Sequence, residues 1–196
     1  MKDYYFKLAK KQGYRSRAAY KLKQINKRFG VIKKGYTVVD LGASPGGWSQ
    51  VASELSGGKV VAVDISPMKP IEGVEFLRGD ITSASTIKAL KDMIKEADVV
   101  LCDAAPNLSG RWSYDHARSV ELAESALKIA RVLLKPGGNF VVKVFQGDLL
   151  NDYVKNVREG FRYVKLHSPQ ASRKESAEIY VIAKKYKGLT PWKSIF

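Results

Sequence analysis

The sequence predicts an α/β fold in which helices cover both faces of a doubly wound, mainly parallel β-sheet. Short runs rich in β-branched and apolar residues alternate with helical patterns along most of the chain. This alternation is typical of parallel strands that are joined by crossover helices. The last two predicted strands, Phe161–His167 and Ala177–Ala183, have no helix between them, so one strand near an edge should be antiparallel.

The individual elements follow in a regular order. A first helix is predicted over Arg17–Phe29, with Ser16 as its N-cap and Gly30 as its stop. Strands are predicted at Val38–Leu41, Lys59–Asp64, Val74–Arg78, Ala97–Asp103, Asn139–Phe145, Phe161–His167 and Ala177–Ala183. Further helices are predicted at Trp48–Leu55, Ser85–Lys95, His116–Leu134 and Leu149–Glu159, with Lys135-Pro136-Gly137-Gly138 closing the longest one. The segments Asn107–Asp115 and Ser168–Ser176 are the candidates for mobile loops.

Length and composition indicate one soluble domain over residues 1–196. With 196 residues and 45% hydrophobic content, the chain can build a substantial core. No apolar run approaches membrane-spanning length, and charges stand where a signal peptide would be apolar. A single cysteine, Cys102, excludes an internal disulfide and a cysteine-based zinc site. We therefore expect a cytoplasmic protein that makes no membrane contact.

The net charge of +15 is unevenly distributed. Residues 1–34 contain twelve Lys and Arg against one acid, and residues 155–196 contain ten against three. The middle of the chain is close to neutral, with twelve basic and fifteen acidic residues. Basic flanks of this kind favour a nucleic-acid partner, although a solvated lysine-rich surface is the simpler alternative. Residues 1–34 are accordingly predicted to form a basic helical extension that contributes to RNA binding.

A glycine-rich turn lies between a predicted strand and a predicted helix, within Val38–Gln50. Glycines in such a turn let the backbone approach a ligand closely. The turn contains Asp40 and lacks the Lys-Ser/Thr ending of a phosphate-binding loop. An acidic residue suits a ligand with cationic and hydroxyl groups, so S-adenosylmethionine fits better than a dinucleotide pyrophosphate. The alternative is a tight turn that binds nothing.

Aspartates follow four of the predicted strands near their carboxyl ends. These residues are Asp40, Asp64, Asp80 and Asp103. In open α/β sheets ligands bind beyond this edge, so the four carboxylates are expected to line one site. Asp64 is placed to accept hydrogen bonds from ribose hydroxyls, and Asp80 from an adenine amino group. Each aspartate taken alone is equally compatible with a helix cap.

One lysine interrupts the apolar strand Phe140–Phe145. A lysine in a central strand is costly to bury unless it is paired or functional, whereas on an edge strand it would simply point into water. Glu178 likewise interrupts a predicted strand, and Asp103 ends another. These two acids and Lys143 are expected to form one polar cluster.

With these motifs together, the chain resembles the RrmJ/FtsJ family of S-adenosylmethionine-dependent RNA ribose 2′-O-methyltransferases, and most closely its ribosomal RNA members. The matching stretches run in family order over nearly the whole chain. They are Ser16–Leu22, Val39–Gln50, Asp64–Met68, Cys102–Gly110, Pro136–Gln146 and Ser172–Tyr180. Ser44 and Ala104 depart from the family pattern, but neither removes a functional side chain.

The resemblance implies specific roles for specific residues. The family's catalytic Lys-Asp-Lys-Glu tetrad corresponds to Lys21, Asp103, Lys143 and Glu178, and its cofactor positions correspond to Gly46, Trp48, Asp64, Asp80 and Asp103. The resemblance also implies a Rossmann-like sheet of seven strands. It further implies a monomer that methylates a uridine ribose of large-subunit ribosomal RNA, presented on an assembled subunit.

The resemblance assigns Lys143 as the general base, which requires the neutral amine and hence a strongly lowered pKa. Burial, Lys21 and a cationic sulfonium favour the neutral form, while Asp103 and Glu178 oppose it. A charged Lys143 that orients the hydroxyl, with Asp103 accepting its proton, remains the alternative. Lys21 is expected to position the substrate and to tune the charge of the cluster.

Three other functions compete with this interpretation. One is a tRNA or mRNA-cap ribose methyltransferase, which would share the tetrad. Another is a non-catalytic RNA-binding protein, although all four tetrad positions are filled. The third is a nicotinamide-dependent oxidoreductase. It is disfavoured because the residues of the glycine-rich turn do not follow the dinucleotide-binding fingerprint. No metal site is expected, since His116 and His167 stand isolated in the sequence.

Overall fold

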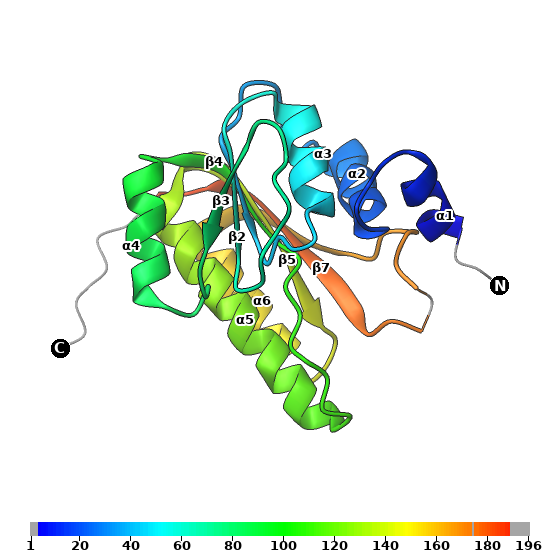
Figure 1. The fold of residues 1–196 in the computed structure, drawn as a ribbon. Coiled ribbons are helices and arrows are strands. Elements are labelled where there is room, and N and C mark those ends of the chain that lie inside the picture. Colours follow the sequence, from blue (N-terminus) through cyan, green and yellow to red (C-terminus); the bar gives the residue numbers. More distant parts are fainter. Residues whose placement is uncertain (1–3, 174, 189–196) are drawn as a thin grey trace.

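A computed structural model describes residues 4–173 and 175–188, and places a seven-stranded sheet between helices on its two faces (Figure 1). The strands are β1 (Val38–Leu41), β2 (Val60–Asp64), β3 (Val74–Arg78), β4 (Ala97–Cys102), β5 (Leu134–Phe145), β6 (Phe161–His167) and β7 (Glu178–Tyr186). The helices are α1 (Tyr4–Lys11), α2 (Ala18–Phe29), α3 (Gly47–Ser56), α4 (Ala84–Met93), α5 (Trp112–Leu133) and α6 (Leu150–Gly160).

The strand order is β3-β2-β1-β4-β5-β7-β6. Strands β1 to β5 pair in parallel, and β7 is antiparallel to both of its neighbours, β5 and β6. The predicted doubly wound sheet with one antiparallel strand near an edge is therefore confirmed. Successive strands are added toward one edge of the sheet from β1 to β3 and toward the other edge from β4 onward. This switch in strand order places the expected ligand crevice beyond the carboxyl ends of β1 and β4.

Each face of the sheet has its own apolar core. On one face Leu127 of α5 and Val157 of α6 pack with Phe140 of β5. On the other face Leu22 of α2 and Trp48 of α3 pack with residues of β1, β4, β5 and β7. Burial on both faces explains why the central strands are continuous apolar runs in the sequence.

The start of α2 differs from the prediction. Arg17, not Ser16, occupies the cap position, and no side chain caps the helix. The first free amides, those of Ala19 and Tyr20, donate instead to the main-chain oxygens of Ser16 and Arg17. The predicted stop is confirmed, since Gly30 has φ 58° and its N–H donates to the Asn26 carbonyl.

The connection around α5 also differs. This helix begins at Trp112, four residues before the predicted start, so the end of the predicted loop Asn107–Asp115 is helical. Strand β5 begins at Leu134, directly after the helix, because Leu134 already pairs with Ala97. The segment Lys135–Gly138, predicted to close the helix before the strand, is instead an irregular part of β5, and the register with β4 shifts between Ala97 and Val99.

An additional helix, α1, precedes the first predicted one. It packs on α2 through Ala9 and Tyr20, which form a small cluster with Ala171 from the segment before β7. The main-chain N–H of Ala171 donates to the Gln24 side chain of α2 at 2.9 Å, so part of the predicted mobile loop Ser168–Ser176 is anchored. No helix among the described residues has the length and apolar character needed to span a membrane.

Candidate active site

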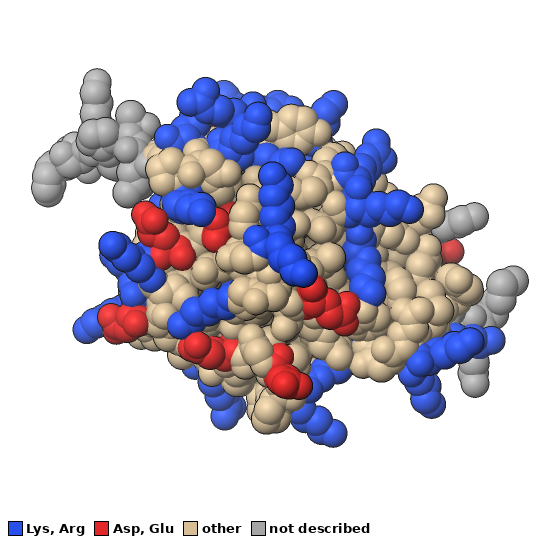
Figure 2. Space-filling view, turned by 90° about the horizontal axis from the view of Figure 1, so that it is seen from above, with Lys and Arg blue, Asp and Glu red and all other residues tan. Residues whose placement is uncertain are grey.

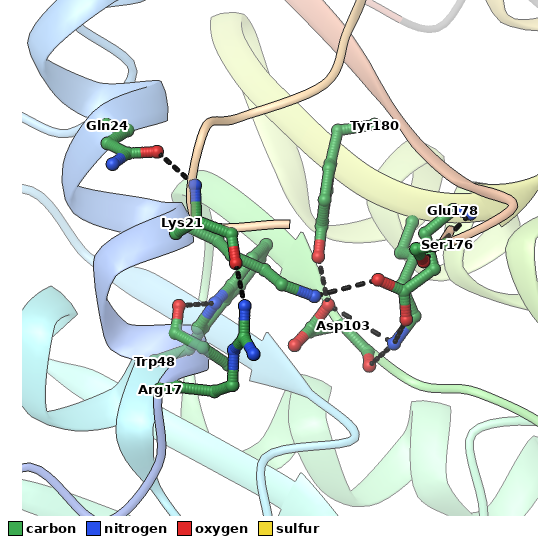
Figure 3. A network of polar contacts seen from close by, with 11 residues as sticks. Arg17, Lys21, Gln24, Trp48, Asp103, Ser176, Glu178 and Tyr180 are labelled. Carbon is green, nitrogen blue, oxygen red and sulfur yellow. Dashed lines mark hydrogen bonds and ion pairs between the residues drawn. The ribbon is translucent and has the colours of Figure 1, made fainter. Parts of the chain in front are cut away.

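Four charged side chains from separate segments meet at the carboxyl end of the parallel strands. Figure 3 labels three of them, Lys21, Asp103 and Glu178. The Lys21 Nζ of α2 lies 2.8 Å from Glu178 Oε2 at the start of β7. The Lys143 Nζ of β5 lies 3.4 Å from Glu178 Oε1 and 3.3 Å from Asp103 Oδ1, directly after β4. It also donates to the main-chain oxygen of Asp103 at 2.8 Å. The structure thus brings together all four residues of the tetrad.

The sheet and α2 fix where these side chains lie. Lys143 belongs to a central strand and is only 6% exposed, which excludes the edge-strand alternative. It pairs with Tyr180 across the β5–β7 ladder, and Glu178 pairs with Phe145 two residues further along. Lys21 lies on the buried face of α2, which the Trp48 indole anchors by donating to the Ala18 carbonyl at 2.8 Å.

The lysines and acids of the cluster stabilise the charged forms of one another. Burial by itself lowers the pKa of Lys143, but Asp103 and Glu178 outweigh it and leave that pKa raised. Burial by itself raises the pKa of Glu178, but Lys143 and Lys21 outweigh it and leave that pKa lowered. In this geometry Lys143 is therefore an ammonium and Glu178 a carboxylate at neutral pH.

Tyr180 is a further member of the cluster that the sequence did not indicate. Its hydroxyl donates to Asp103 Oδ1 at 2.7 Å, and Lys21 Nζ lies 5.7 Å from the centre of its ring. Burial raises the pKa of Tyr180 well above its usual value, so the hydroxyl stays protonated and remains a donor. A tyrosine in an apolar strand is typical of a core residue, and no local signal separates it from one.

Beside the tetrad lies a pocket of about 900 Å³ at the carboxyl ends of β1, β2 and β4. Three of the predicted cofactor residues line it, namely Asp64, Asp80 and Asp103. Its wall continues along α5, with Arg118 and Lys128 among the lining residues. Because Asp103 belongs to both the pocket and the tetrad, a ligand in the pocket would reach the cluster of charged groups.

Main-chain donors hold two of the pocket carboxylates in place. Asp64 accepts the N–H of Ser44 at 2.9 Å and that of Ser66 at 2.7 Å. Asp80 accepts the N–H and the hydroxyl of Thr82, each at 2.8 Å, and these bonds lower its pKa. Both side chains are therefore hydrogen-bond acceptors with fixed orientation, as ligand hydroxyl and amino groups require.

The glycine-rich turn approaches the pocket closely. A side chain at Gly42, where φ is 70°, would place its Cβ only 2.6 Å from the Cβ of Ala104. Gly46, with φ 113°, caps the amino end of α3 but does not line the pocket. The Trp48 side chain is buried against Tyr180, and Trp48 does not line the pocket.

Asp40 does not line the pocket, in contrast to the expectation of four aspartates at one edge. It lies inside β1, is 0% exposed, and accepts a hydrogen bond from Ser49 Oγ at 2.6 Å. Its other oxygen, Oδ1, has no partner within the described part of the chain. Burial raises the pKa of Asp40 to about 7. This carboxyl group therefore binds Ser49 in the first turn of α3. The carboxylates that a ligand in the pocket can contact are those of Asp64, Asp80 and Asp103.

A second unpredicted residue, Arg15, connects the segment before α2 to the loops around the pocket. Its guanidinium donates to the carbonyl oxygens of Pro45 at 3.2 Å, Lys69 at 2.5 Å and Pro70 at 2.7 Å.

Residues 4–173 and 175–188 contain no group of three or more His, Cys, Asp or Glu side chains that could hold a metal ion.

Comparison with known proteins agrees with this geometry. The model of the FtsJ-like methyltransferase family matches residues 14–186. Ribosomal RNA large subunit methyltransferase E of Methanosarcina acetivorans is 65% identical over 187 residues, which are 94% of this chain and 69% of that protein. The Archaeoglobus fulgidus protein of the same name is 56% identical, over 94% of this chain and 96% of its own length. A Plasmodium falciparum crystal structure, described as a proposed ribosomal RNA methyltransferase, is similar with a TM-score of 0.82 and 30% identity, covering 90% of this chain and 100% of that one.

Proposed function

The chain belongs to the FtsJ-like methyltransferase family, and from this premise we propose that it methylates a ribose 2′-oxygen of large-subunit ribosomal RNA with S-adenosylmethionine as methyl donor. The observation that carries the proposal is the tetrad of Lys21, Asp103, Lys143 and Glu178 beside a pocket that shares Asp103. A filled tetrad favours an enzyme over a non-catalytic RNA-binding protein. The names of the relatives favour ribosomal RNA over tRNA or an mRNA cap.

The pocket fits S-adenosylmethionine by the chemistry of its lining. Asp64, Asp80 and Asp103 offer carboxylate acceptors to a ligand that carries hydroxyls, amino groups and positive charge. We assign Asp64 to the ribose hydroxyls and Asp80 to the adenine amino group, with Asp103 facing the reacting end. Gly46 and Trp48 lie outside this lining, and we propose that they contribute by holding the amino end of α3 beside the pocket. When bound, S-adenosylmethionine supplies an electrophilic methyl group on a sulfonium.

The reaction forms a bond between the 2′-oxygen and the methyl carbon, while the bond from that carbon to sulfur breaks and the hydroxyl proton leaves. Lys143, held as an ammonium, orients the hydroxyl and stabilises the negative charge that develops on its oxygen. Asp103 accepts the proton, because its carboxylate lies both on the pocket wall and 3.3 Å from Lys143. Glu178 holds Lys143 and Lys21 together, and Lys21 positions the RNA.

This assignment differs from the hypothesis that Lys143 is the general base. A base must be neutral before it accepts a proton, and the two acids beside Lys143 favour its charged form. As a charged orienting group Lys143 would lose activity when pH rises through its pKa, whereas as a base it would gain activity.

Positive charge outside the site supports an RNA partner. On the face drawn in Figure 2, Lys and Arg side chains are spread widely, with smaller patches of Asp and Glu between them. Basic residues from separate segments come close enough to repel one another. The pKa of Lys184, for example, is lowered by burial and by the neighbouring Lys33 and Lys185. A surface of this kind attracts phosphates along an extended polyanion.

We further infer that the basic segment 1–34 contributes to RNA binding, since α1 carries the exposed residues Lys7, Lys10 and Lys11 close to the Lys21 helix. The protein is proposed to act in the cytoplasm as a monomer, on RNA within an assembled large subunit. Assembly would present one ribose in a fixed conformation, which the small tetrad site requires.

The direct test uses S-adenosylmethionine with a labelled methyl group. The protein is incubated with undermethylated large subunits, with naked large-subunit RNA, or with tRNA, and the 2′-O-methylated nucleotides are then mapped. We expect label at one ribose of large-subunit RNA, with faster transfer to the assembled subunit. Label on tRNA alone would overturn the substrate, and faster labelling of naked RNA would overturn the assembled context.

A further inference from the structure

The segment that follows β4 and the first turn of α5 together expose three large apolar side chains near the active site. Leu108, Trp112 and Tyr114 are 71%, 51% and 56% exposed. They follow directly after the stretch Ala104–Asn107, which lines the pocket. Exposed apolar side chains are usually scattered singly, so three of them within seven residues indicate a candidate contact surface. Figure 1 shows the amino end of α5, which begins at Trp112, extending beyond the sheet at the lower edge of the molecule.

The ring of Trp112 has a fixed orientation. It stacks on Phe145 with centroids 6.0 Å apart and 17° between the planes, and on His116 with 6.1 Å and 15°. His116 is itself buried, and its Nε2 accepts the main-chain N–H of Leu149 at 3.2 Å. The rings of Phe145 and His116, both nearly parallel to the indole, therefore fix its plane. About half of the Trp112 surface remains exposed to solvent.

The loop that precedes Trp112 is also fixed. The N–H and the hydroxyl of Ser109 donate to Asp115 Oδ1, both at 2.8 Å, and the N–H of Gly110 donates to Oδ2 at 3.2 Å. These bonds lower the pKa of Asp115, which is therefore ionised at neutral pH. The exposed aromatic surface is thus preorganised, which reduces the entropy lost when a ligand stacks on it.

The fixed ring lies close to the tetrad. Phe145, on which Trp112 stacks, is two residues beyond Lys143 in β5 and pairs with Glu178 of β7. We propose that Trp112, flanked by Leu108 and Tyr114, is a stacking platform for an unpaired RNA base at or next to the methylated ribose. The inference rests on the proposed function. A flat, preoriented ring beside a site for one nucleotide favours a base over a protein surface, and the exposed Arg111 next to it offers a phosphate contact.

The test compares two RNA probes that differ only in their bases. Ten-nucleotide oligouridylate and its abasic analogue have the same phosphates, so stacking alone separates their affinities. We expect wild-type protein to bind oligouridylate about tenfold more tightly than the abasic chain, and Trp112→Ala to remove this difference. Trp112→Phe keeps a ring and should retain most of it. Tyr163→Ala, which removes an exposed aromatic from β6, is the matched control and should bind as wild type.

Methylation assays separate this inference from the proposed function. On naked large-subunit RNA, Trp112→Ala should raise KM about tenfold and leave the affinity for S-adenosylmethionine unchanged. An unchanged KM and an unchanged preference for oligouridylate would overturn the platform. A defect seen only on assembled subunits would overturn it as well, because a ribosomal protein would then be the partner. If wild-type protein methylates no RNA at all, the proposed function fails, while the oligouridylate comparison still decides the platform.

Discussion

Lys143 and Glu178 lie 3.4 Å apart in a largely buried site, and each favours the charged form of the other. Glu178 also holds Lys21, so a single carboxylate connects the two lysines of the tetrad. Because a buried charge that has lost its partner is costly, the cluster should respond to substitution as a unit rather than residue by residue.

Replacing Lys143 with alanine should abolish methyl transfer. The change removes the group that orients the hydroxyl and stabilises the developing oxyanion, which corresponds to a loss of at least about 10²-fold in kcat. Binding of S-adenosylmethionine, measured by calorimetry, should stay near normal, since Asp64 and Asp80 are untouched. Lys155→Ala, an exposed lysine on α6, is the control. Substantial residual methylation by Lys143→Ala would remove Lys143 from the catalytic group.

The Glu178→Gln variant distinguishes the two roles of Lys143 through the pH–rate profile. Glu178 is one of two acids that raise the pKa of Lys143, so its neutralisation lowers that pKa. If Lys143 acts as an ammonium, the alkaline limb, where the rate falls, moves to lower pH. If Lys143 acts as a neutral base, the limb where the rate rises moves to lower pH instead. We expect the first result, and the second would restore the base hypothesis.

Replacing Tyr180 with phenylalanine should lower kcat about tenfold while leaving cofactor affinity nearly unchanged. The variant keeps the ring that packs on Trp48 and loses only the hydrogen bond to Asp103. Tyr153→Phe is a matched control, because its buried hydroxyl donates to the Ala123 carbonyl at 2.9 Å, in the core under α5 and α6. Equal losses of activity in the two variants would indicate general destabilisation rather than positioning of Asp103.

Asp40→Asn should stabilise the fold at neutral and alkaline pH. The folded-state pKa of Asp40 is about 7, above its ordinary value of 3.8, so between these values the folded chain binds a proton that the unfolded chain has released. Asp40 therefore makes stability fall as pH rises through this range and stay low above it. Asparagine keeps an acceptor for Ser49 and removes the charge.

Urea unfolding at several pH values measures this effect of Asp40. The variant should gain up to about 4 kcal/mol at pH 8, and the gain should shrink toward zero near pH 4. The exposed Asp152→Asn serves as control. A gain that does not depend on pH would contradict the assignment of the raised pKa to Asp40.

The sequence was most informative where a residue type conflicts with its surroundings. A lysine in an apolar strand indicated a functional group, and Lys143 is indeed buried and paired in a central strand. Tyr180 causes no such conflict, because a tyrosine suits an apolar strand whether or not its hydroxyl serves the site. Asp40 is also a charged residue in an apolar strand. The sequence alone could not distinguish a carboxyl group buried beside the turn from one that lines the pocket.

The boundaries around α5 depend on contacts between distant segments. The helical pattern in the sequence begins at His116, whereas in the structure the helix starts at Trp112, whose ring stacks on Phe145 of β5. Similarly, β5 extends back to Leu134 because Ala97 of β4 is available as a partner. Local sequence patterns do not record tertiary pairing of this kind, so such element ends were predicted less well than the order of the strands.

Neutralising α1 should weaken RNA binding and its dependence on salt. The triple variant Lys7→Gln, Lys10→Gln, Lys11→Gln removes three exposed charges near Lys21 of α2. If all three contact phosphates of unpaired RNA, the slope of log affinity against log salt should become shallower by about 2. Filter binding of in vitro transcribed large-subunit RNA between 50 and 300 mM salt (roughly the range in which such slopes are linear) measures it.

A control with matched charge separates location from net charge in the salt experiment. Lys88, Lys91 and Lys95 are exposed on and just after α4, on the opposite side of the molecule from α1 in Figure 1. Changing them to glutamine alters the net charge equally. If segment 1–34 contacts the RNA, the α4 variant should keep nearly the full slope of log affinity against log salt. That slope changes only when phosphate contacts are lost. Equal loss of slope in both variants would mean that the RNA responds to the overall field and that α1 has no specific part in binding.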